Sequence, residues 1–275
     1  MIRPRRAYAN TRFGQMHLRI WGNGASAPHT GLVCLHPVPY SGRYFDTFAE
    51  LAAADTVVVT PDLIGYGGSS AMPEPISIEN HADAVADALD SLHEGGFRDT
   101  NFVPLGFHTG SAVGGEMAIA HPELVSKVVF VTYPYFEPAE RAQRLQDLPG
   151  STPMTTDAEY RQSRWDFAIE NQPGGVPRER GFVSFSEELR AGDRAWYGFH
   201  SMFSYAPEER LPLIQQRALV INTEGPLREP TRAAAQMLND CDYREFLHMQ
   251  KAVFELNTAE IASVVSDFLQ SAQLG

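Results

Sequence analysis

The chain has little of several features that would assign it to a special class of protein. Its 275 residues include only two cysteines, so we expect no disulfide framework. No stretch reaches the roughly 18 apolar residues that a membrane-spanning helix requires. The first ten residues carry charge but no apolar signal segment. We therefore expect a cytoplasmic protein with no membrane partner.

Positive charge is also scarce. The sequence contains 22 Lys and Arg against 34 Asp and Glu, which gives a formal net charge of −12. Because binding to a phosphate backbone requires a basic surface, we expect no nucleic-acid partner. The acidic residues are scattered, as is typical of a soluble surface. The expected partner is a small-molecule substrate, and a homodimer is left open.

Metal and nucleotide motifs are missing as well. Cys34 and Cys241 are isolated, and no pair of histidines or carboxylates has the spacing of metal ligands. The glycines of residues 65–68 do not match the dinucleotide-binding fingerprint, and Asp62 precedes them instead of following. We expect no metal and no cofactor.

What the chain does contain is an alternation of apolar runs and amphipathic segments. Continuous apolar runs are typical of strands buried on both faces, and an alternating pattern is typical of a hairpin. Strands that alternate with helices predict an α/β fold with a mostly parallel central sheet and helices on both faces. The predicted hairpin covers residues 7–21, and the predicted strands cover 31–36, 56–60, 127–132, 217–222 and 243–248.

Residues 135–210 interrupt this alternation. The segment is rich in arginine, glutamate and aromatic residues, and it contains no apolar run that resembles a buried strand. We predict a helical cap insertion over 135–210, with a core domain formed by residues 1–134 and 211–275.

The remaining chain is organised around residues 101–122. An apolar run ends at Leu105, Gly106 and Gly110 bracket a turn, and helical spacing follows. Strand, sharp turn and helix form the layout of a nucleophile elbow, whose flanking glycines relieve crowding of the backbone. The residue at the apex is His108, where Ser, Cys or Asp is usual.

Taken together, these segments resemble the α/β-hydrolase superfamily over essentially the whole chain. Residues 36–42 resemble the family's loop after its third strand, residues 61–70 its turn after the fourth, and residues 101–122 its elbow. With a predicted cap, the chain is most similar to the branch of epoxide hydrolases, haloalkane dehalogenases, C–C hydrolases and small esterases. The resemblance implies an α/β-hydrolase fold.

The catalytic triad that this resemblance implies is altered at all three positions. His108 stands in place of the nucleophile. The acid position matches Gly225, with Glu224 one residue before it, and the histidine position falls on Lys251, with His248 three residues earlier. His108, Glu224 and His248 are therefore the candidate catalytic side chains.

The oxyanion hole that the family builds from two backbone amides is retained in this sequence. The resemblance assigns these amides to Thr109 and Val38, and the residue before Val38 is a proline without an N–H. Such donors stabilise the negative charge that develops on a carbonyl oxygen in the transition state.

Three functions remain open for this arrangement. The first is hydrolysis of a small carbonyl compound, most simply an ester, with His108 as general base or as nucleophile. The second is cofactor-independent proton transfer by His108 in an isomerase, C–C lyase or cyclase. The third is a protein that binds a small molecule without catalysis.

The expected substrate-binding residues come from the loop after the third strand, the elbow and the cap. His36 is also suited to a structural role, and Arg43 either clamps a carboxylate or stays solvated. The cap aromatics either line the cleft or pack a small core of the cap. The candidates are His36, Tyr40, Ser41, Arg43, Phe107, Tyr135, Trp165, Trp196 and His200.

Overall fold

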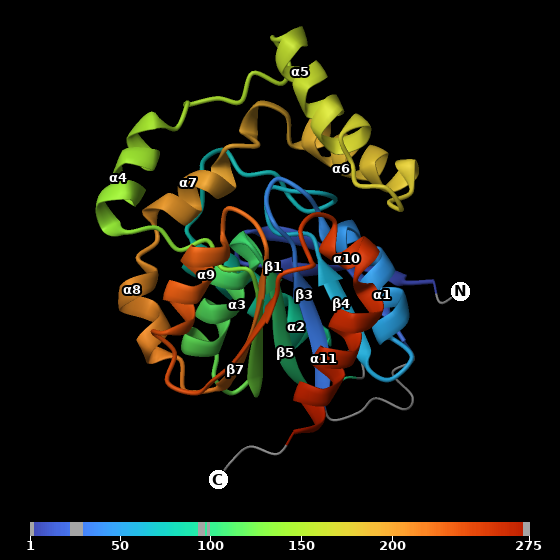
Figure 1. Ribbon diagram of the computed structural model, residues 1–275, viewed down its shortest axis with the longest axis vertical. Coiled ribbons are helices and arrows are strands. Elements are labelled where there is room, and N and C mark those ends of the chain that lie inside the picture. The colour runs from blue at the N-terminus through green and yellow to red at the C-terminus, as the bar shows by residue number, and fades with distance from the viewer. Residues whose placement is uncertain (1–2, 23–29, 93–96, 98–99, 272–275) are drawn as a thin grey trace.

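An eight-stranded sheet forms the centre of the protein in the computed structural model, which describes residues 3–22, 30–92, 97 and 100–271 (Figure 1). The strand order is β1-β2-β4-β3-β5-β6-β7-β8. Strand β2 is antiparallel to β1 and β4, and all other pairs are parallel. The strands are β1 Arg5–Thr11, β2 Gly14–Trp21, β3 Thr30–Leu35, β4 Val57–Pro61, β5 Asn101–Phe107, β6 Lys127–Val131, β7 Arg217–Thr223 and β8 Cys241–Phe246.

Helices cover both faces of this sheet. Residues of α2, α3 and α9 share one hydrophobic cluster, and residues of α1, α10 and α11 share another on the opposite face. The core helices are η2 Gly42–Phe45, α1 Asp46–Ala52, α2 Ile78–Leu92, α3 Thr109–Ala120, α9 Arg228–Ala235, α10 Val253–Leu256 and α11 Thr258–Gln270. The architecture confirms the predicted α/β-hydrolase fold.

The apolar runs form the central strands because both faces of those strands are covered. Every residue of β4 and of β6 is buried. Burial of both faces removes the alternation of polar and apolar residues that a half-exposed strand shows. The uninterrupted runs of valine in the sequence are therefore read correctly as strands.

Strand β8 differs from its prediction, because it spans Cys241–Phe246 and not residues 243–248. It lies at one edge of the sheet, and its residues are half-buried or exposed. An edge strand does not need an apolar run, so the sequence pattern places its ends poorly. Residue 248 consequently lies in the loop beyond the strand.

Residues 135–210, hereafter the cap segment, contain helices that lie above the sheet in the view of Figure 1. Ala168, Ile169 and Phe185 form a small hydrophobic cluster within this segment. Its separation from the core as a domain stays a prediction. The helices are α4 Pro138–Asp147, α5 Ala158–Trp165, η4 Asp166–Glu170, α6 Arg178–Ala191, η5 Gly192–Arg194, α7 Tyr197–Ser204 and α8 Pro207–Arg210, followed by η6 Leu211–Leu213. Among the described residues, no helix combines the length and apolar character needed to cross a membrane.

Candidate active site

The sharp turn between β5 and α3 places His108 at the carboxyl edge of the sheet. Strand β5 ends at Phe107, α3 begins at Thr109, and His108 between them has φ 51° and ψ −120°. A positive φ is strained for a residue with a Cβ atom. Strain of this kind persists where the surrounding structure holds the turn firmly, and such places are often functional sites.

Two glycines make this turn possible by allowing close backbone contacts. A Cβ atom on Gly106 would lie 2.3 Å from the carbonyl oxygen of Gly110. A Cβ atom on Gly110 would lie 1.9 Å from the carbonyl oxygen of Leu35 in β3. No side chain fits at either position, which agrees with the crowding that the sequence analysis assigns to these glycines.

Hydrogen bonds hold the turn against its neighbours. The His108 amide donates to the carbonyl oxygen of Thr132 at 3.2 Å, and the Ser111 hydroxyl donates to the carbonyl oxygen of Gly106 at 2.9 Å. Because Leu35 pairs with Gly106, the loop after β3 runs beside the turn. The structure therefore brings the Val38 segment and His108 to the same edge of the sheet.

The imidazole of His108 has no hydrogen-bond partner within the described part of the chain. Its ring packs against the ring of Phe107, with 4.0 Å between the centroids. Desolvation lowers the pKa of His108 to about 4, so the ring is neutral at pH 7. A neutral imidazole offers a free lone pair for proton abstraction or nucleophilic attack.

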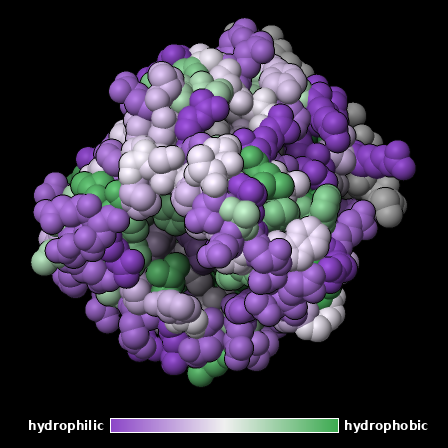
Figure 2. Space-filling model, turned by 90° about the horizontal axis from the view of Figure 1, so that it is seen from above, coloured by the Kyte–Doolittle hydropathy of each residue, from purple (hydrophilic) through white to green (hydrophobic). Residues whose placement is uncertain are grey.

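A cavity of about 710 Å³ lies in front of His108. This volume is within the range of small-molecule sites. Its walls come from the loop at 37–40, the turn at 107–108, the loops at 223–227 and 250–255, and the cap segment. The face on the cap side is hollowed, with hydrophobic residues among a mostly hydrophilic surface (Figure 2). The space before the histidine is therefore open and is not filled by side chains of the cap segment.

Five of the candidate site residues line this cavity. Phe107 and His108 come from the turn, Val38 and Tyr40 from the loop after β3, and Glu224 from the loop after β7. The hydroxyl of Tyr40 donates to Glu188 at 3.0 Å, so this ring is held in place from the cap segment.

Two backbone amides near the turn are the candidate oxyanion donors; Val38 lines the cavity, whereas Thr109 is buried and is not among the lining residues. Thr109 is the first residue of α3, and the N–H groups of a first helical turn have no acceptor within the helix. Among the described residues, the Val38 amide makes no hydrogen bond that closes the loop after β3. Val38 is itself buried against Gly198 of the cap segment.

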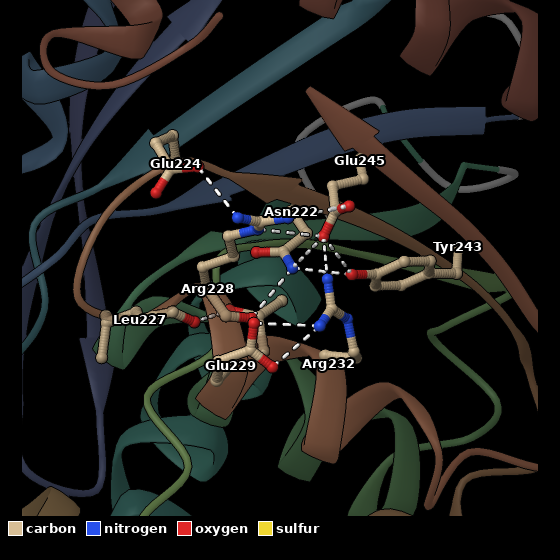
Figure 3. A network of polar contacts seen from close by, with 9 residues as sticks. Asn222, Glu224, Leu227, Arg228, Glu229, Arg232, Tyr243 and Glu245 are labelled. Atoms are coloured by element: carbon tan, nitrogen blue, oxygen red, sulfur yellow. Dashed lines mark hydrogen bonds and ion pairs between the residues drawn. The ribbon is translucent and has the colours of Figure 1, made fainter. Parts of the chain in front are cut away.

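The carboxylate of Glu224 is engaged away from His108. It accepts a hydrogen bond from Arg228 at 3.2 Å, and Arg228 also contacts Glu245 at 3.3 Å (Figure 3). Asn222 and Tyr243 complete this network beside the end of β7. Glu224 therefore lines the cavity without being paired to the imidazole.

His248 does not reach the cavity. Its side chain is 57% exposed and lies 2.9 Å from the carboxylate of Glu260 at the start of α11. The residues that line the cavity from the same loop are Gln250, Lys251 and Ala252. The structure thus does not bring His248 and His108 together.

Three candidates from the loop after β3 hold that loop in place and do not line the cavity. His36 is fully buried, and its two ring nitrogens contact the carbonyl oxygen of Pro37 at 3.0 Å and the amide of Leu63 at 2.9 Å. Ser41 is buried beside the same turn. The Arg43 side chain faces Asp46 at 3.9 Å and Glu187 at 3.8 Å.

The remaining candidates from residues 135–210 also lie outside the lining of the cavity. Trp165 packs on Phe185 at 5.4 Å between centroids, as part of the small core of the cap segment. The rings of Trp196 and His200 also pack together, with 5.7 Å between their centroids. Tyr135 is buried in the main hydrophobic cluster. These candidates pack against other side chains, whereas two other aromatic residues of the cap segment, Phe167 and Phe199, line the cavity.

Several residues that line the cavity are not among the candidates predicted from the sequence. Arg164 and Arg180 enter from the cap segment, and Tyr44, Phe254 and Glu255 enter from helices of the core. Glu255 accepts a hydrogen bond from Arg180 at 2.7 Å across 75 positions of sequence. No local pattern marks such a pair, because the pair exists only after the cap segment is placed over the core.

Within the described residues, no group of three or more His, Cys, Asp or Glu side chains is arranged to hold a metal ion.

Comparison with known proteins assigns the family. A model of the alpha/beta hydrolase family matches residues 32–262. This chain belongs to the alpha/beta hydrolase family. The match includes the loop after β3, the turn at His108, the cap segment and the first turn of α11. In this alpha/beta hydrolase, His108 lies within the matched range, between β5 and α3.

Individual curated relatives of this alpha/beta hydrolase match less than half of the chain. It is 32% identical over 127 residues to a fluoroacetate dehalogenase from Burkholderia sp, covering 43% of this chain and 40% of that protein. It thus spans about two-fifths of the length of the curated relatives that it matches.

Solved structures match over nearly the whole chain but with low identity. An esterase from Thermogutta terrifontis superposes with a TM-score of 0.75 at 16% identity, covering 97% of this chain and 98% of that chain. An enol-lactonase from Burkholderia xenovorans superposes with a TM-score of 0.73 at 20% identity, covering 96% and 100%. At these identities the similarity shows the shared fold.

Proposed function

We propose that the protein is a hydrolase that cleaves a small ester-type carbonyl compound in the cavity before His108. The observation that carries this proposal is a neutral imidazole, without a hydrogen-bond partner in the described chain, on a strained turn that faces open space. Membership of the alpha/beta hydrolase family supports hydrolysis as the reaction class.

In this proposal the substrate carbonyl lies against the amides of Thr109 and Val38. These donors stabilise the oxyanion as the carbonyl carbon becomes tetrahedral. In one route His108 takes a proton from the attacking water and returns it to the departing alcohol oxygen. In the other, the imidazole attacks the carbonyl carbon and the alcohol leaves, and water then cleaves the acyl-imidazole to the acid and free His108. Neither route needs a carboxylate beside the imidazole, because the neutral ring already carries a free lone pair.

The low pKa of His108 favours hydrolysis over proton transfer at carbon. A group whose conjugate acid has a pKa of about 4 is a weak base. Protons bound to carbon are far less acidic than those of a water molecule that is attacking a carbonyl. Incorporation of solvent deuterium at a carbon atom of the product would instead support an isomerase or lyase.

Replacement of His108 tests the proposal directly. With 4-nitrophenyl butyrate, we expect H108A and H108Q to lower kcat at least 100-fold while the circular-dichroism spectrum stays unchanged, because the base or nucleophile is lost. Intact-protein mass spectrometry of the quenched wild-type reaction separates the two routes, since only the nucleophilic route adds the butyryl mass.

Variants of the two candidates near the altered triad positions, His248 and Glu224, provide the result that could contradict the proposal. H248A and E224Q are measured beside H108A under the same conditions. Full activity of H108A together with loss of activity in H248A would reject the proposal and would favour a base that reaches the cavity from the loop after β8.

A further inference from the structure

Charged side chains are few in the cavity, and most of them are neutralised within the fold. Arg164 donates to Glu188 at 2.6 and 2.9 Å. Arg180 is paired with Glu255 at 2.7 Å. Glu224 is paired with Arg228 outside the cavity, as described above. These groups have little capacity left for a charged ligand.

Lys251 is the exception among the charged lining groups that the structure describes. Its side chain makes no ion pair and no hydrogen bond in the described part of the chain, and its ammonium lies 5.9 Å from the centre of the Phe167 ring. The residue is exposed, and it is also one of the residues that line the cavity.

The loop that carries Lys251 is held firmly on both sides. The carbonyl oxygen of Met249 accepts the amide of Glu224 at 2.8 Å, and Met249 itself is buried. Ala252 has φ 52° and precedes α10 directly. The ammonium is thus presented from a backbone that is already ordered, which lowers the entropic cost of binding.

The use of lysine is unusual in this chain. Of 22 basic residues, only Lys127 and Lys251 are lysines. The Lys127 ammonium donates hydrogen bonds to the carbonyl oxygens of Phe268, Leu269 and Ser271 at 2.6 to 3.0 Å. Lys251 is therefore the lysine that stays available to a ligand.

We propose that Lys251 binds a carboxylate of the substrate, so that the protein acts on small carboxylic acids that carry their reactive carbonyl at a second position. A single ammonium matches a single negative charge, whereas a phosphate group usually takes several donors or an arginine fork. Tyr44, Phe107 and Phe254 provide an apolar wall for the carbon chain between the two groups. Because the protein as a whole is negatively charged, most of its surface repels anions, and Lys251 marks a place that attracts them.

The position of the reactive carbonyl in this assignment rests on the proposed function, but carboxylate binding does not. Binding is therefore measured in H108A, which cannot turn over a substrate by the proposed route. Calorimetry compares 4-phenylbutyrate with its neutral amide, 4-phenylbutyramide. We expect the acid to bind at least tenfold more tightly, and we expect this preference to vanish in H108A/K251M and to persist in H108A/K251R.

A matched control removes a positive charge that does not line the cavity. Arg194 lies in η5, and its side chain hydrogen-bonds to the carbonyl oxygen of Met72 at 3.5 Å. H108A/R194M loses the same charge as H108A/K251M and should keep the preference for the acid. Equal binding of acid and amide in H108A, or a preference that survives K251M, would overturn the assignment. Tighter binding of 3-phenylpropylphosphonate than of 4-phenylbutyrate would overturn the choice of carboxylate.

Kinetics add a second readout. Mono-4-nitrophenyl glutarate carries a free carboxylate, and its methyl ester is the neutral match. In wild type we expect kcat/KM to favour the acid about tenfold, with K251M losing this preference through KM. If neither ester is cleaved while the binding preference holds, the proposed hydrolysis fails and the carboxylate site stands. If both esters are cleaved equally well, the proposed hydrolysis stands and the carboxylate site fails.

Discussion

At the scale of single residues, the environment of His108 determines its chemistry. The ring packs on Phe107 and lacks any hydrogen bond in the described chain, so nothing compensates the loss of water around the charged form. Burial without a partner lowers the pKa of a histidine. The usual orienting carboxylate of a catalytic histidine would raise the pKa, and the network in Figure 3 keeps Glu224 from that role.

This shift predicts an unusual pH profile. If His108 acts as a neutral base or nucleophile with a pKa of about 4, kcat/KM for 4-nitrophenyl butyrate should stay nearly constant between pH 7 and pH 5. An ordinary histidine of pKa 6.5 would lose activity about 25-fold over this range. Rates are measured at constant ionic strength, with circular dichroism at pH 5 to show that the fold is intact. A fall of that size would contradict the assigned environment.

The same shift also affects stability, with a sign that follows from proton linkage. Between pH 6.5 and 4 the unfolded chain protonates His108 more readily than the folded chain does. The free energy of unfolding should therefore decrease as the pH falls through this range and should reach its full value above pH 6.5. Urea titrations of wild type and H108Q at pH 7 and pH 5 measure the part that belongs to His108. The decrease should be smaller in H108Q.

At the scale of elements, the turn between β5 and α3 depends on contact between backbones. Gly110 approaches the carbonyl group of Leu35 because α3 starts directly against β3. This contact aligns the helix N-terminus, and with it the Thr109 amide, beside the loop that carries Val38. The geometry of the two amides is thus a consequence of how closely the helix and the strand can pack.

G110A tests the importance of this contact. The added methyl group would meet backbone atoms of a central strand, which cannot move without breaking the pairing of β3 with β5. We expect a loss of about 3 kcal/mol or more in the free energy of unfolding, or failure to fold. Urea denaturation gives the value. G150A is the control, since nothing lies within 4 Å of the added atom, and its effect should stay below about 0.5 kcal/mol.

At the scale of the whole molecule, the cap segment is joined to the core by apolar packing and by polar contacts on both sides of the cavity. Glu116 of α3 is buried and accepts hydrogen bonds from Tyr205 at 2.9 Å and from Arg210 of α8 at 3.0 Å. On the other side of the cavity, Arg180 bonds with Glu255 at 2.7 Å and with the carbonyl oxygen of Arg43 at 2.8 Å. These contacts set the distance between the cap segment and His108.

E116A should loosen the side of the cap segment that joins α3. It removes a buried carboxylate and leaves the Tyr205 hydroxyl without its acceptor, while the partly exposed Arg210 regains water. We expect a destabilisation of about 2 kcal/mol and faster cleavage within residues 138–204 in limited proteolysis. Loss of the exposed pair between Glu140 and Arg144 in E140A should change neither measurement appreciably. If E116A and E140A had equal stability and equal proteolysis rates, the contacts of Glu116 would not hold the cap segment on the core.

The elements of the core could be predicted because their signals are local. Apolar runs become β3, β4, β6 and β7 since parallel strands are buried on both faces. The glycines around His108 mark a turn that only glycine can flank. The edge strand β8 was displaced by two residues in the prediction, because a half-exposed strand leaves no apolar run by which to locate its ends.

The sequence by itself determined the α/β fold, the position of the turn and the identity of the residue at its apex. Only the tertiary structure decided which charged side chains face the cavity: Lys251 does, whereas His248 turns to Glu260 and Arg43 to Glu187. The physical reason is that the sequence patterns that specify strands, helices and turns extend over only a few neighbouring residues. The direction of a loop side chain depends instead on partners that folding brings together from distant parts of the chain.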